Sequence, residues 1–359
     1  MKIEKLTILA VVGLVAAFMA FSGGQAQAAH CDATVTAPAS IQAAIDANPG
    51  DVVCLDDSGG VFSQSVIFGP EDSGITLSAE DGDTPVLDGT GTADSGTTLL
   101  VDAIRLLDGV SGVTINGLEI RDYTSVSCCG QGNAIQAWAA NTSNITVRNN
   151  YMHDNSWSAI LVGSEGAETH SGWAVHHNIL KDNATLFFSA QLELTNCNGC
   201  SIHHNTIDGG VIGILVQARN TVPDSGLVPI QGVSVKRNKV GEIGKPDIGV
   251  YLLSLASGPL DPFPPIVGAQ SKLQAVSVGS NNIESDGLGV LVWGFLGGEA
   301  INPALVRNDF FCDGATGIWL VDQITNAKVV NNDFVGASCT PLVDGGDETK
   351  NPLVPANPS

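Results

Sequence analysis

Positive charge is scarce in this chain. Fifteen Lys and Arg residues stand against 37 Asp and Glu residues, and the formal net charge is −22 at pH 7. Such an excess of carboxylates repels a polyphosphate backbone, which argues against nucleic acid as a partner. It also repels polyanionic sugar chains unless cations intervene. The acidity is otherwise typical of a protein that stays soluble in a salty or extracellular setting.

Long apolar runs are missing after the first 28 residues. Within that stretch, Lys2 and Lys5 precede an apolar run over residues 6–21, and Ala26-Gln-Ala28 has the small residues of a cleavage site. This order is typical of a secretory signal peptide, and the run is short for a membrane anchor. We therefore expect cleavage near Ala28 and a secreted, periplasmic or cell-surface protein with no membrane span in its mature chain.

Helical periodicity is nearly absent. One short amphipathic helix is predicted within residues 39–50, where Ile41, Ala44 and Ile45 share a face and Pro49-Gly50 ends it. The repeats that follow contain no longer run with helical spacing. Their lack of helices argues against leucine-rich or βαβ units.

In place of helices, the chain repeats a motif of an apolar residue, two polar residues, an Asn or Asp, any residue, and an apolar residue. A degenerate copy runs from Ile115 to Ile120, with Leu118 at the Asn position. Starts about 24 to 43 residues apart are typical of a solenoid. Seven regular copies begin at Val147, Val175, Ile202, Val235, Val278, Val306 and Val330.

Most copies are followed by a second short apolar run, bounded by Gly, Asn, Asp or Ser, which is typical of a strand. Short strands at one repeat per turn predict a parallel β-helix with coils about 4.8 Å apart. An inward Asn at each turn tolerates unusual backbone angles, and its amide can bond the coils above and below. In this alignment Asp309 and Asp333 take the Asn position in the last two copies.

We expect a single all-β domain over residues 29–345, with roughly eight to ten coils. The helix at 39–50 would cap its open end, and regular coils would run over residues 112–340. Residues 218–231 and 254–273 are predicted to be insertions on one face, and residues 346–359 an extended or disordered tail. The protein is expected to be a monomer.

All eight Cys residues follow the predicted signal peptide, in a compartment where disulfides persist. Cys31–Cys54 would close the N-terminal coil, and Cys312–Cys339 would join the last two coils. Cys197-Asn-Gly-Cys200 resembles a redox or metal motif, but it has no second pair at zinc-ribbon spacing, and export favours a local disulfide. The sequence leaves open the connectivity of Cys128, Cys129, Cys197 and Cys200.

If alternate residues of the second run point outward, they form two columns on one face of the solenoid. The first holds Gln136, Leu161, Glu193, Leu215, Tyr251, Leu291 and Trp319. The second holds Trp138, Gln217 and Trp293. Trp and Tyr rings suit stacking on sugars. The residues predicted to bind substrate are Gln136, Trp138, Gln217, Tyr251, Trp293 and Trp319. In the alternative, the two insertions cover this strip and its residues are structural.

The turn before this strip repeats a cation followed by Asp, as Arg121-Asp122, His153-Asp154 and Lys181-Asp182. Stacked coils would bring the three carboxylates about 5 Å apart, where the cations or a bound Ca²⁺ would neutralise them. The same groups could supply a base and a cation for proton abstraction, or an acid and a base for hydrolysis. The alternative is ordinary turn chemistry, in which alternating charges solvate one another.

Two His pairs also fall in register. His176-His177 and His203-His204 lie on successive copies, between Arg148 and Lys236. Two imidazoles one coil apart could hold a metal ion. No carboxylate or third ligand is evident in the column, which favours exposed stacked histidines without a metal.

The signal peptide, the Ser40-Ile-Gln-Ala-Ala-Ile-Asp46 segment before Pro49-Gly-Asp51, and the Asn-x-apolar coils resemble the pectin-lyase-like right-handed parallel β-helix superfamily. The resemblance covers most of residues 39–340 and implies a right-handed β-helix. The superfamily includes polysaccharide lyases, glycoside hydrolases, mannuronan epimerases and phage tailspikes. Because the fold hosts so many activities, function has to be argued from the site.

A shorter stretch is similar to alginate lyases of the chondroitinase B type, in which a Glu-x-Glu strand holds Ca²⁺, a Lys follows and the next coil carries an Arg. Glu193 and Arg219 match this pattern. Gln191 replaces one Glu, and Thr195-Asn196 stands where the Lys is expected. The Gly-His-Gly stretch and paired Asp of polygalacturonases and the Asp-Pro-His-Asp of mannuronan epimerases are absent.

The sequence therefore predicts a secreted protein that binds an acidic or neutral polysaccharide, with lyase-type cleavage as its candidate chemistry and hydrolysis less favoured. The rival function is a non-catalytic surface, matrix or adhesion protein built on a rigid β-helix. The candidate catalytic residues are His153, Asp154, Lys181, Asp182, Glu193 and Arg219. The candidate Ca²⁺ ligands are Asp122, Asp154, Asp182 and Glu193.

Overall fold

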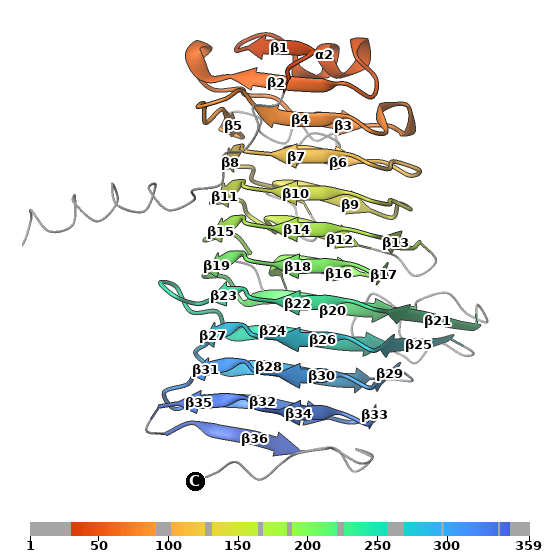
Figure 1. Ribbon diagram of the computed structural model, residues 1–359, viewed down its shortest axis with the longest axis vertical. Helices are drawn as coiled ribbons and strands as arrows, with labels where there is room; N and C mark the ends of the chain where they lie inside the picture. The colour runs from red at the N-terminus through yellow and green to blue at the C-terminus, as the bar shows by residue number, and fades with distance from the viewer. Residues whose placement is uncertain are drawn as a thin grey trace, which may run out of the picture. The chain divides into compact units, whose positions relative to one another are not determined.

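The computed structural model describes residues 30–90, 102–125, 131–163, 168–184, 189–220, 226–256, 269–295, 298–336 and 338–344, with only the backbone described for 226–229 and 269. The predicted signal peptide, the tail at 346–359, Cys128 and Cys129 lie outside these residues. From Cys31 on, the described chain winds into stacked coils whose paired strands are all parallel (Figure 1). The predicted right-handed parallel β-helix is confirmed.

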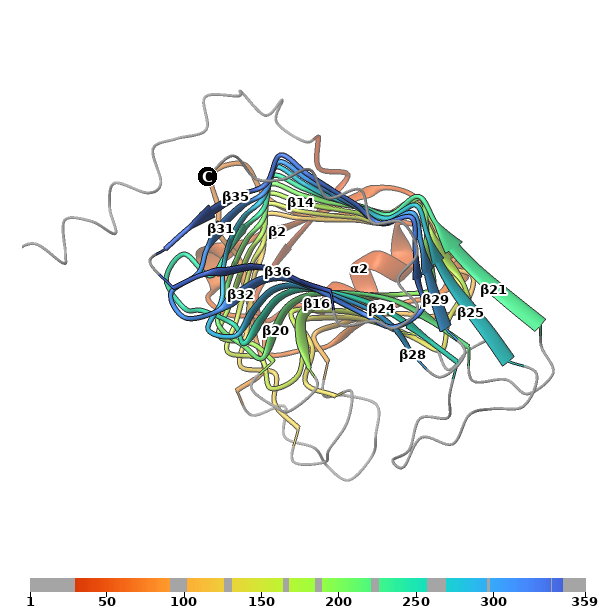
Figure 2. The same ribbon diagram turned by 90° about the horizontal axis from the view of Figure 1, so that it is seen from below.

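Three long sheets enclose the core, as the view along the stack shows (Figure 2). In the described chain, sheet A holds β1 (Ala33–Thr36), β2 (Val52–Asp56), β4 (Thr76–Ala79), β7 (Thr114–Asn116), β10 (Thr146–Arg148), β14 (Ala174–His176), β18 (Ser201–His203), β22 (Ser234–Lys236), β26 (Ser277–Gly279), β30 (Ala304–Val306) and β34 (Lys328–Val330). Sheet B holds β5 (Val86–Asp88), β8 (Glu119–Arg121), β11 (Tyr151–His153), β15 (Ile179–Lys181), β19 (Thr206–Asp208), β23 (Lys239–Val240), β27 (Asn282–Glu284), β31 (Asp309–Phe311) and β35 (Asp333–Val335). Sheet C holds β3 (Val66–Phe68), β6 (Ile104–Leu106), β9 (Ile135–Trp138), β12 (Ile160–Gly163), β16 (Ala190–Thr195), β20 (Ile212–Arg219), β24 (Ile248–Leu255), β28 (Leu288–Phe295), β32 (Thr316–Val321) and β36 (Thr340–Asp344).

Two smaller sheets extend the coils beyond sheet C. One pairs β13 (His170–Ser171) with β17 (Cys197–Asn198), and the other holds β21 (Gly226–Gln231), β25 (Ala269–Gln274), β29 (Gly298–Ile301) and β33 (Ile324–Thr325).

The strands β21 and β25 correct the prediction of insertions at 218–231 and 254–273. Apart from Asn220 and Ala256, the described parts of both segments are strands, because β20 and β24 run into them and β21 and β25 end them. Pro229 fits this arrangement because β21 is the edge strand of its sheet, where a missing N–H breaks no ladder. The remaining parts, 221–225 and 257–268, lie outside the described residues.

The core consists of inward apolar columns. Val147, Val175 and Ile202 stack in sheet A and are fully buried, and Ile160 and Ile214 occupy one inward column of sheet C. Burying each such side chain contributes about 1.5–3 kcal/mol relative to leaving it in water. The alternation of inward and outward residues therefore fixes which side chains remain for function.

A ladder of buried Asn side chains runs along the corner between sheets A and B. The Nδ2 of Asn178 donates to the carbonyl of Val147 at 2.9 Å and to the Oδ1 of Asn205 at 3.0 Å, while its own Oδ1 accepts from the backbone of Asn150 at 3.0 Å. Each amide therefore satisfies backbone groups that water does not reach. The ladder consists of Asn150, Asn178, Asn205, Asn238, Asn281, Asn308 and Asn332.

Two details of the predicted Asn column were wrong. In the last two coils Asn308 and Asn332 hold the ladder position, while Asp309 and Asp333 begin β31 and β35 and are exposed. An amide both donates and accepts, whereas an ionised carboxylate only accepts, so Asn alone can continue the ladder. The left-handed backbone falls on the residue before each ladder Asn, as at His177 with φ of 58°.

The N-terminal end of the stack is closed by α2 (Ile41–Ala47), as predicted for the capping helix. The Oγ of Ser40 accepts from the backbone N–H of Ala43 at 3.1 Å, and the buried Ile41 and Ile45 join the core. Two short 3₁₀ helices, η2 (Asp57–Gly59) and η3 (Pro70–Asp72), follow. No helix among the described residues is long and apolar enough to cross a membrane.

Three disulfides stabilise the described coils. Cys31–Cys54 and Cys312–Cys339 are bonded as predicted. Cys197–Cys200 is the local disulfide that the sequence favoured over a metal or redox pair. On the chain-entropy estimate, each of the two longer loops is worth about 3 kcal/mol.

Candidate functional site: the outer face of sheet C

The outer face of sheet C carries both columns that the sequence predicted. Backbone pairing places the first column in register, in the order Gln136, Leu161, Glu193, Leu215, Tyr251, Leu291 and Trp319. In the second column, Thr195 pairs with Gln217, Gln217 with Leu253, and Leu253 with Trp293. Trp319 lies opposite Leu291, so Trp293 and Trp319 are diagonal neighbours on consecutive strands.

Burial divides this face into two halves. In the N-terminal half, Leu161 is 1% exposed, Gln217 6% and Glu193 8%. In the C-terminal half, Tyr251 and Trp293 are half-buried and Trp319 is 38% exposed. The predicted open strip from Gln136 to Trp319 is therefore closed over much of its length, and its accessible surface is aromatic.

Glu193 forms the centre of a buried polar cluster on β16 and β20. Its Oε1 accepts a hydrogen bond from the hydroxyl of Thr195 at 2.9 Å, and that hydroxyl lies 3.5 Å from the Oε1 of Gln217. Burial raises the pKa of Glu193, while the Thr195 hydrogen bond and the charge of Arg219 act in the opposite direction. A carboxyl with a raised pKa can hold a proton where an exposed one has lost it, which suits a proton donor.

The backbone next to this cluster is held by Asn196, whose φ is 52°. Its Oδ1 accepts from the N–H of Arg219 and its Nδ2 donates to the carbonyl of Arg219, both at 2.8 Å. Two bonds to one residue fix the end of β20 against the preceding coil. Asn196 therefore positions Arg219, a role that its place in the sequence pattern did not reveal.

Gln191, which stands at the first Glu of the lyase pattern, has a structural role. Its Nε2 donates to the carbonyls of Asn183 and Asp208 at 3.1 and 2.8 Å, and its Oε1 accepts from the Nδ2 of Asn183 at 2.7 Å. The side chain is fully buried. These bonds extend a second, shorter amide ladder that begins with Asn155 and Asn183.

The aromatic half of the face contains a buried donor. The rings of Trp293 and Phe295 lie 4.5 Å apart at 51°, and the Nε1 of Trp293 is buried with no hydrogen-bond partner among the described residues. Leaving a buried donor unsatisfied costs about 1–3 kcal/mol.

Trp138 lies at the other end of the second column. Its indole packs against Gly163 on the neighbouring strand, and a Cβ added to Gly163 would collide with the ring. The carbonyl of Gly163 accepts from the Nε2 of His170 at 3.2 Å. The packing of Trp138 therefore depends on Gly163, to which the sequence pattern gave no role.

A buried network that the sequence did not reveal supports this corner. The Nε1 of Trp173 donates to the hydroxyl of Thr142 at 2.9 Å, and that hydroxyl lies 2.8 Å from the Nδ1 of His170. The Nε2 of His170 donates its hydrogen to the carbonyl of Gly163, so the Nδ1 accepts from the hydroxyl of Thr142. Each hydrogen-bonding group of Trp173, Thr142 and His170 then has a partner. Burial lowers the pKa of His170 to about 4, so this imidazole stays neutral at neutral pH.

The predicted cation–Asp turns lie at the end of the sheet B strands, in the predicted register. His153 pairs with Arg121 on one side and with Lys181 on the other. The Nδ1 of His153 lies 2.6 Å from Asp154, and the Nζ of Lys181 lies 3.7 Å from Asp182.

Each carboxylate in these turns therefore has a basic side chain on its own coil, and Asp122 likewise has Arg121 at 3.6 Å. All three Asp residues adopt left-handed backbone, with φ between 52° and 59°. The structure brings them into one column at the end of sheet B, and it places Glu193 and Arg219 on sheet C. The catalytic and Ca²⁺ roles assigned to these residues stay predictions.

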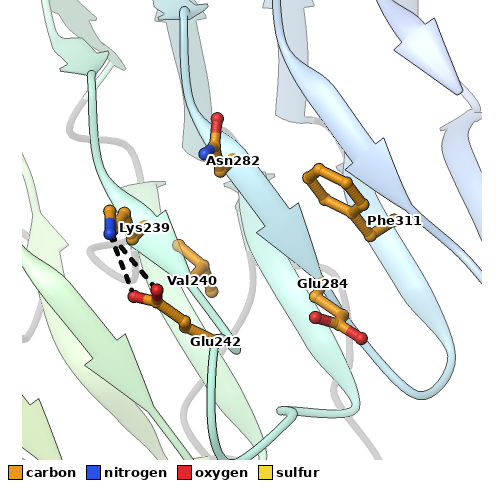
Figure 3. A pocket seen from close by; sticks show the side chains of 6 residues that line it. All are labelled: Lys239, Val240, Glu242, Asn282, Glu284 and Phe311. Atoms are coloured by element: carbon orange, nitrogen blue, oxygen red, sulfur yellow. Dashed lines mark hydrogen bonds and ion pairs between the residues drawn. The ribbon is translucent and has the colours of Figure 1, made fainter. Parts of the chain in front are cut away.

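Sheet B also carries a pocket of about 210 Å³, shown in Figure 3. It is lined by Lys239, Val240, Glu242, Asn282, Glu284 and Phe311. The Nζ of Lys239 lies 3.2 and 3.3 Å from the two carboxylate oxygens of Glu242, and Glu284 pairs with Lys245 at 2.8 Å. Because its charges are paired locally, this pocket offers a ligand less than the outer face of sheet C does.

The comparisons with known proteins concern the fold. No protein-family model matches the chain, and no curated protein sequence matches it. Among solved structures, the tailspike of E. coli bacteriophage HK620 aligns with a TM-score of 0.56 at 13% identity, over 84% of this chain and 50% of the tailspike. The family 28 exopolygalacturonase of Yersinia enterocolitica aligns with a TM-score of 0.52 at 12% identity, over 89% and 78% of the two chains.

A third solved structure, the DFA-IIIase of Arthrobacter chlorophenolicus A6, aligns with a TM-score of 0.51 at 14% identity, over 85% of this chain and 77% of that enzyme. At such low identities these likenesses show the fold alone. The chain has a right-handed parallel β-helix fold like that of these three solved structures. Its function rests on its own side chains.

Proposed function

We propose that this protein is a secreted carbohydrate-binding β-helix protein, whose glycan site is the outer face of sheet C from Glu193 to Trp319. The observation that carries the proposal is the set of three aromatic rings, the half-buried Tyr251 and Trp293 and the exposed Trp319, on the consecutive strands β24, β28 and β32. Coils about 4.8 Å apart hold such rings at a spacing suited to successive sugar contacts, and indole and phenol groups combine an apolar face with a polar edge.

The adjacent polar cluster supports the same ligand class. Gln217 pairs with Leu253, which pairs with Trp293, so the cluster around Glu193 and the aromatic rings share one face. Two further structures with this fold support a carbohydrate ligand by what they contain, a tailspike double mutant with a pentasaccharide and XylC with xylose.

The finer proposal is cleavage of the bound glycan, with Glu193 as the proton donor. A protonated carboxyl can protonate the departing glycosidic oxygen, and the charge of Arg219 can neutralise a uronate carboxylate. Among the described residues of both outward columns, Glu193 is the single carboxylate and no Lys is present. A complete acid–base pair is thus not assembled there, and binding is the stronger part of the proposal.

Export is the remaining part of the proposal. The leader-like first 28 residues motivate it, and the three disulfides are consistent with an oxidising compartment. A mature N-terminus near Ala29 in protein recovered from outside the cytoplasm would support it. Retention of residues 1–28 in that protein would contradict it.

The test is a screen of alginate, pectate, chondroitin and neutral glycans, with and without Ca²⁺. Binding is followed by Trp fluorescence, and cleavage by reducing ends and by the ultraviolet absorbance of unsaturated products. Glu193→Gln keeps the shape of the side chain and removes its proton, so it should retain binding and lose any cleavage. If no glycan changes the fluorescence, the carbohydrate proposal fails.

A structural protein is the second candidate function. The observation that favours it is the burial of Leu161, Leu215 and Leu291 on the same outer face, since a buried strip binds nothing. The amide ladder and the disulfides would then serve a rigid, protease-resistant scaffold.

A further inference from the structure

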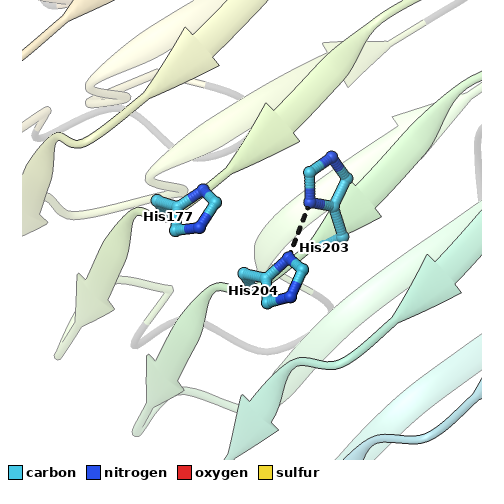
Figure 4. Close-up of side chains that lie close together, drawn as sticks. All are labelled: His177, His203 and His204. Atoms are coloured by element: carbon cyan, nitrogen blue, oxygen red, sulfur yellow. Dashed lines mark hydrogen bonds between the residues drawn. The ribbon is translucent and has the colours of Figure 1, made fainter. Parts of the chain in front are cut away.

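Four histidines gather at the corner between sheets A and B. His176 ends β14 and His203 ends β18, and the two residues pair in register. His177 and His204 follow them with left-handed φ of 58° and 57°. Figure 4 shows His177, His203 and His204 drawn together at this corner, two of them from one coil and one from the next.

The rings stack by type from coil to coil. His176 and His203 are parallel with centroids 4.8 Å apart, and His177 and His204 are parallel with centroids 4.9 Å apart. Within each coil the two Nδ1 atoms face one another at 2.9 Å, both between His176 and His177 and between His203 and His204. One nitrogen of each pair must donate to the other, so each pair shares a proton between two strong metal-binding atoms.

A third nitrogen comes within reach of one of these pairs. Ring nitrogens of His177, His203 and His204 all lie within 4.8 Å of one another. His177, which has left-handed backbone, is thus the third ligand of the pair His203 and His204. Comparing equivalent positions of successive coils did not reveal it.

We propose that His177, His203 and His204 form a site for a divalent transition-metal ion of the Cu²⁺ and Ni²⁺ type. Two nitrogens 2.9 Å apart, each about 2.0–2.1 Å from one ion, subtend an angle of about 90°. That angle suits adjacent positions of a square-planar or octahedral complex, whereas the tetrahedral geometry of Zn²⁺ needs a wider one. The ion would displace the hydrogen between the two Nδ1 atoms, and both neutral rings would then carry their single proton on Nε2.

The surrounding charges set the selectivity of this site. Arg148 lies on the preceding coil, and Lys236 and Arg237 lie on the following one. These cations oppose any bound cation, so the site holds only ions that bond strongly to nitrogen. Mg²⁺ and Ca²⁺, which prefer oxygen ligands, are expected to stay unbound here.

The coils themselves supply the variant that tests the site. Asn149 occupies the position of His177 on the preceding coil, also with left-handed φ, so His177→Asn with His204→Asn should preserve the fold. Far-ultraviolet circular dichroism and the melting temperature check this. His30→Gln and His153→Gln each remove a histidine outside the cluster and serve as controls.

The experiment titrates Cu²⁺, Ni²⁺, Zn²⁺ and Mg²⁺ separately into the full chain without a polyhistidine tag, at neutral pH. We expect one Cu²⁺ or Ni²⁺ per chain, weaker Zn²⁺ and no Mg²⁺, and a Cu²⁺ electron paramagnetic resonance spectrum with nitrogen coupling. The Asn double variant should weaken Cu²⁺ binding at least tenfold, while both controls keep it. Equal binding by the double variant, loss of binding in either control, or no binding of any of these ions overturns the proposal.

Discussion

The Asn ladder and the outer face of sheet C both bury polar side chains, and they do so under different rules. In the ladder the same residue recurs on seven successive coils, and each amide before the last one bonds the coil before and the coil after. On the outer face Glu193 is bonded by Thr195 of its own strand, and no neighbouring coil repeats it. A buried polar residue that recurs on every coil is one that each coil needs in order to fold. A buried polar group that occurs only once, such as Glu193, is not explained by folding in this way.

The two regions also differ in what their burial costs. A ladder amide has all its hydrogen bonds, so its desolvation is compensated. Burial of Glu193 raises its pKa, which means that the ionised form is less stable there than in water. A fold that depended only on packing would place an apolar residue at that position. The outer face thus retains a group whose burial does not serve folding.

Removing a central ladder amide should have the largest effect of the changes considered. Asn205→Ala leaves the backbone N–H of Asn178 and the carbonyl of Val175 without a hydrogen-bond partner, because both bond to the Asn205 side chain. Each stranded group costs about 1–3 kcal/mol, so we expect a loss of about 3 kcal/mol or more in the free energy of unfolding. Denaturant unfolding followed by circular dichroism measures it.

Asn332→Ala is the matched control for that change. Asn332 ends the ladder and is half-buried, and its amide bonds only towards the preceding coil. Its loss should cost clearly less than the loss of Asn205. Equal costs at the two positions would mean that the ladder does not act through stacking on both sides.

The period of the Asn motif was enough to predict the coils, the parallel β-helix fold and the register of the outward columns. It was not enough to place the last two ladder positions, because Leu305 and Val306 are both apolar and allow either Asn308 or Asp309 to follow in phase. The deciding property is that the ladder residue must donate as well as accept.

The sequence was also not enough to predict which residues on the outer face of sheet C are buried. Alternation in a strand tells which way Leu161 or Trp319 points, and nothing about what lies over it. Strands β21 and β25 were missed for a related reason. Their pairing depends on neighbouring coils rather than on their own sequences, of which β21 contains Gly226 and Pro229 and β25 is mostly polar. The three-histidine cluster brings together His177 and His203, which occupy different positions of the repeat. Aligning equivalent positions of successive coils does not show that two such residues are close.

The buried carboxyl gives the second prediction, which concerns pH. Because folding raises the pKa of Glu193 above the unfolded value of 4.5, the folded protein binds this proton more tightly. The resulting stabilisation is complete below pH 4.5 and is lost as the pH rises through the folded pKa. Glu193→Gln should therefore raise the melting temperature at neutral pH, and the gain should shrink towards pH 4.5. A variant that melts lower at neutral pH would show that the charge of Glu193 stabilises the fold.

Trp319 tests whether the accessible half of the face is a binding surface. An exposed ring supports little core, so Trp319→Ala should change the free energy of unfolding by less than about 1 kcal/mol. Its loss should weaken oligosaccharide binding by about 1 kcal/mol, roughly a factor of five in Kd. Calorimetry and Trp fluorescence measure the two quantities. A destabilisation of about 3–5 kcal/mol, typical of a core Trp, together with unchanged glycan binding would favour the structural role.

The paired charges at the end of sheet B should matter least. The side chains of Asp154 and Asp182 are 57% and 53% exposed, and exposed ion pairs are worth about 0.2–1 kcal/mol each. Because both carboxylates already have a basic partner on their own coil, any rise in melting temperature with Ca²⁺ should be small. The double variant Asp154→Asn with Asp182→Asn should remove that rise if these carboxylates bind the ion, since ligand stabilisation follows mass action. The same Ca²⁺ response in the double variant would leave these residues with their turn role alone, and the contrast between repeated folding groups and single functional groups would then rest on the outer face of sheet C.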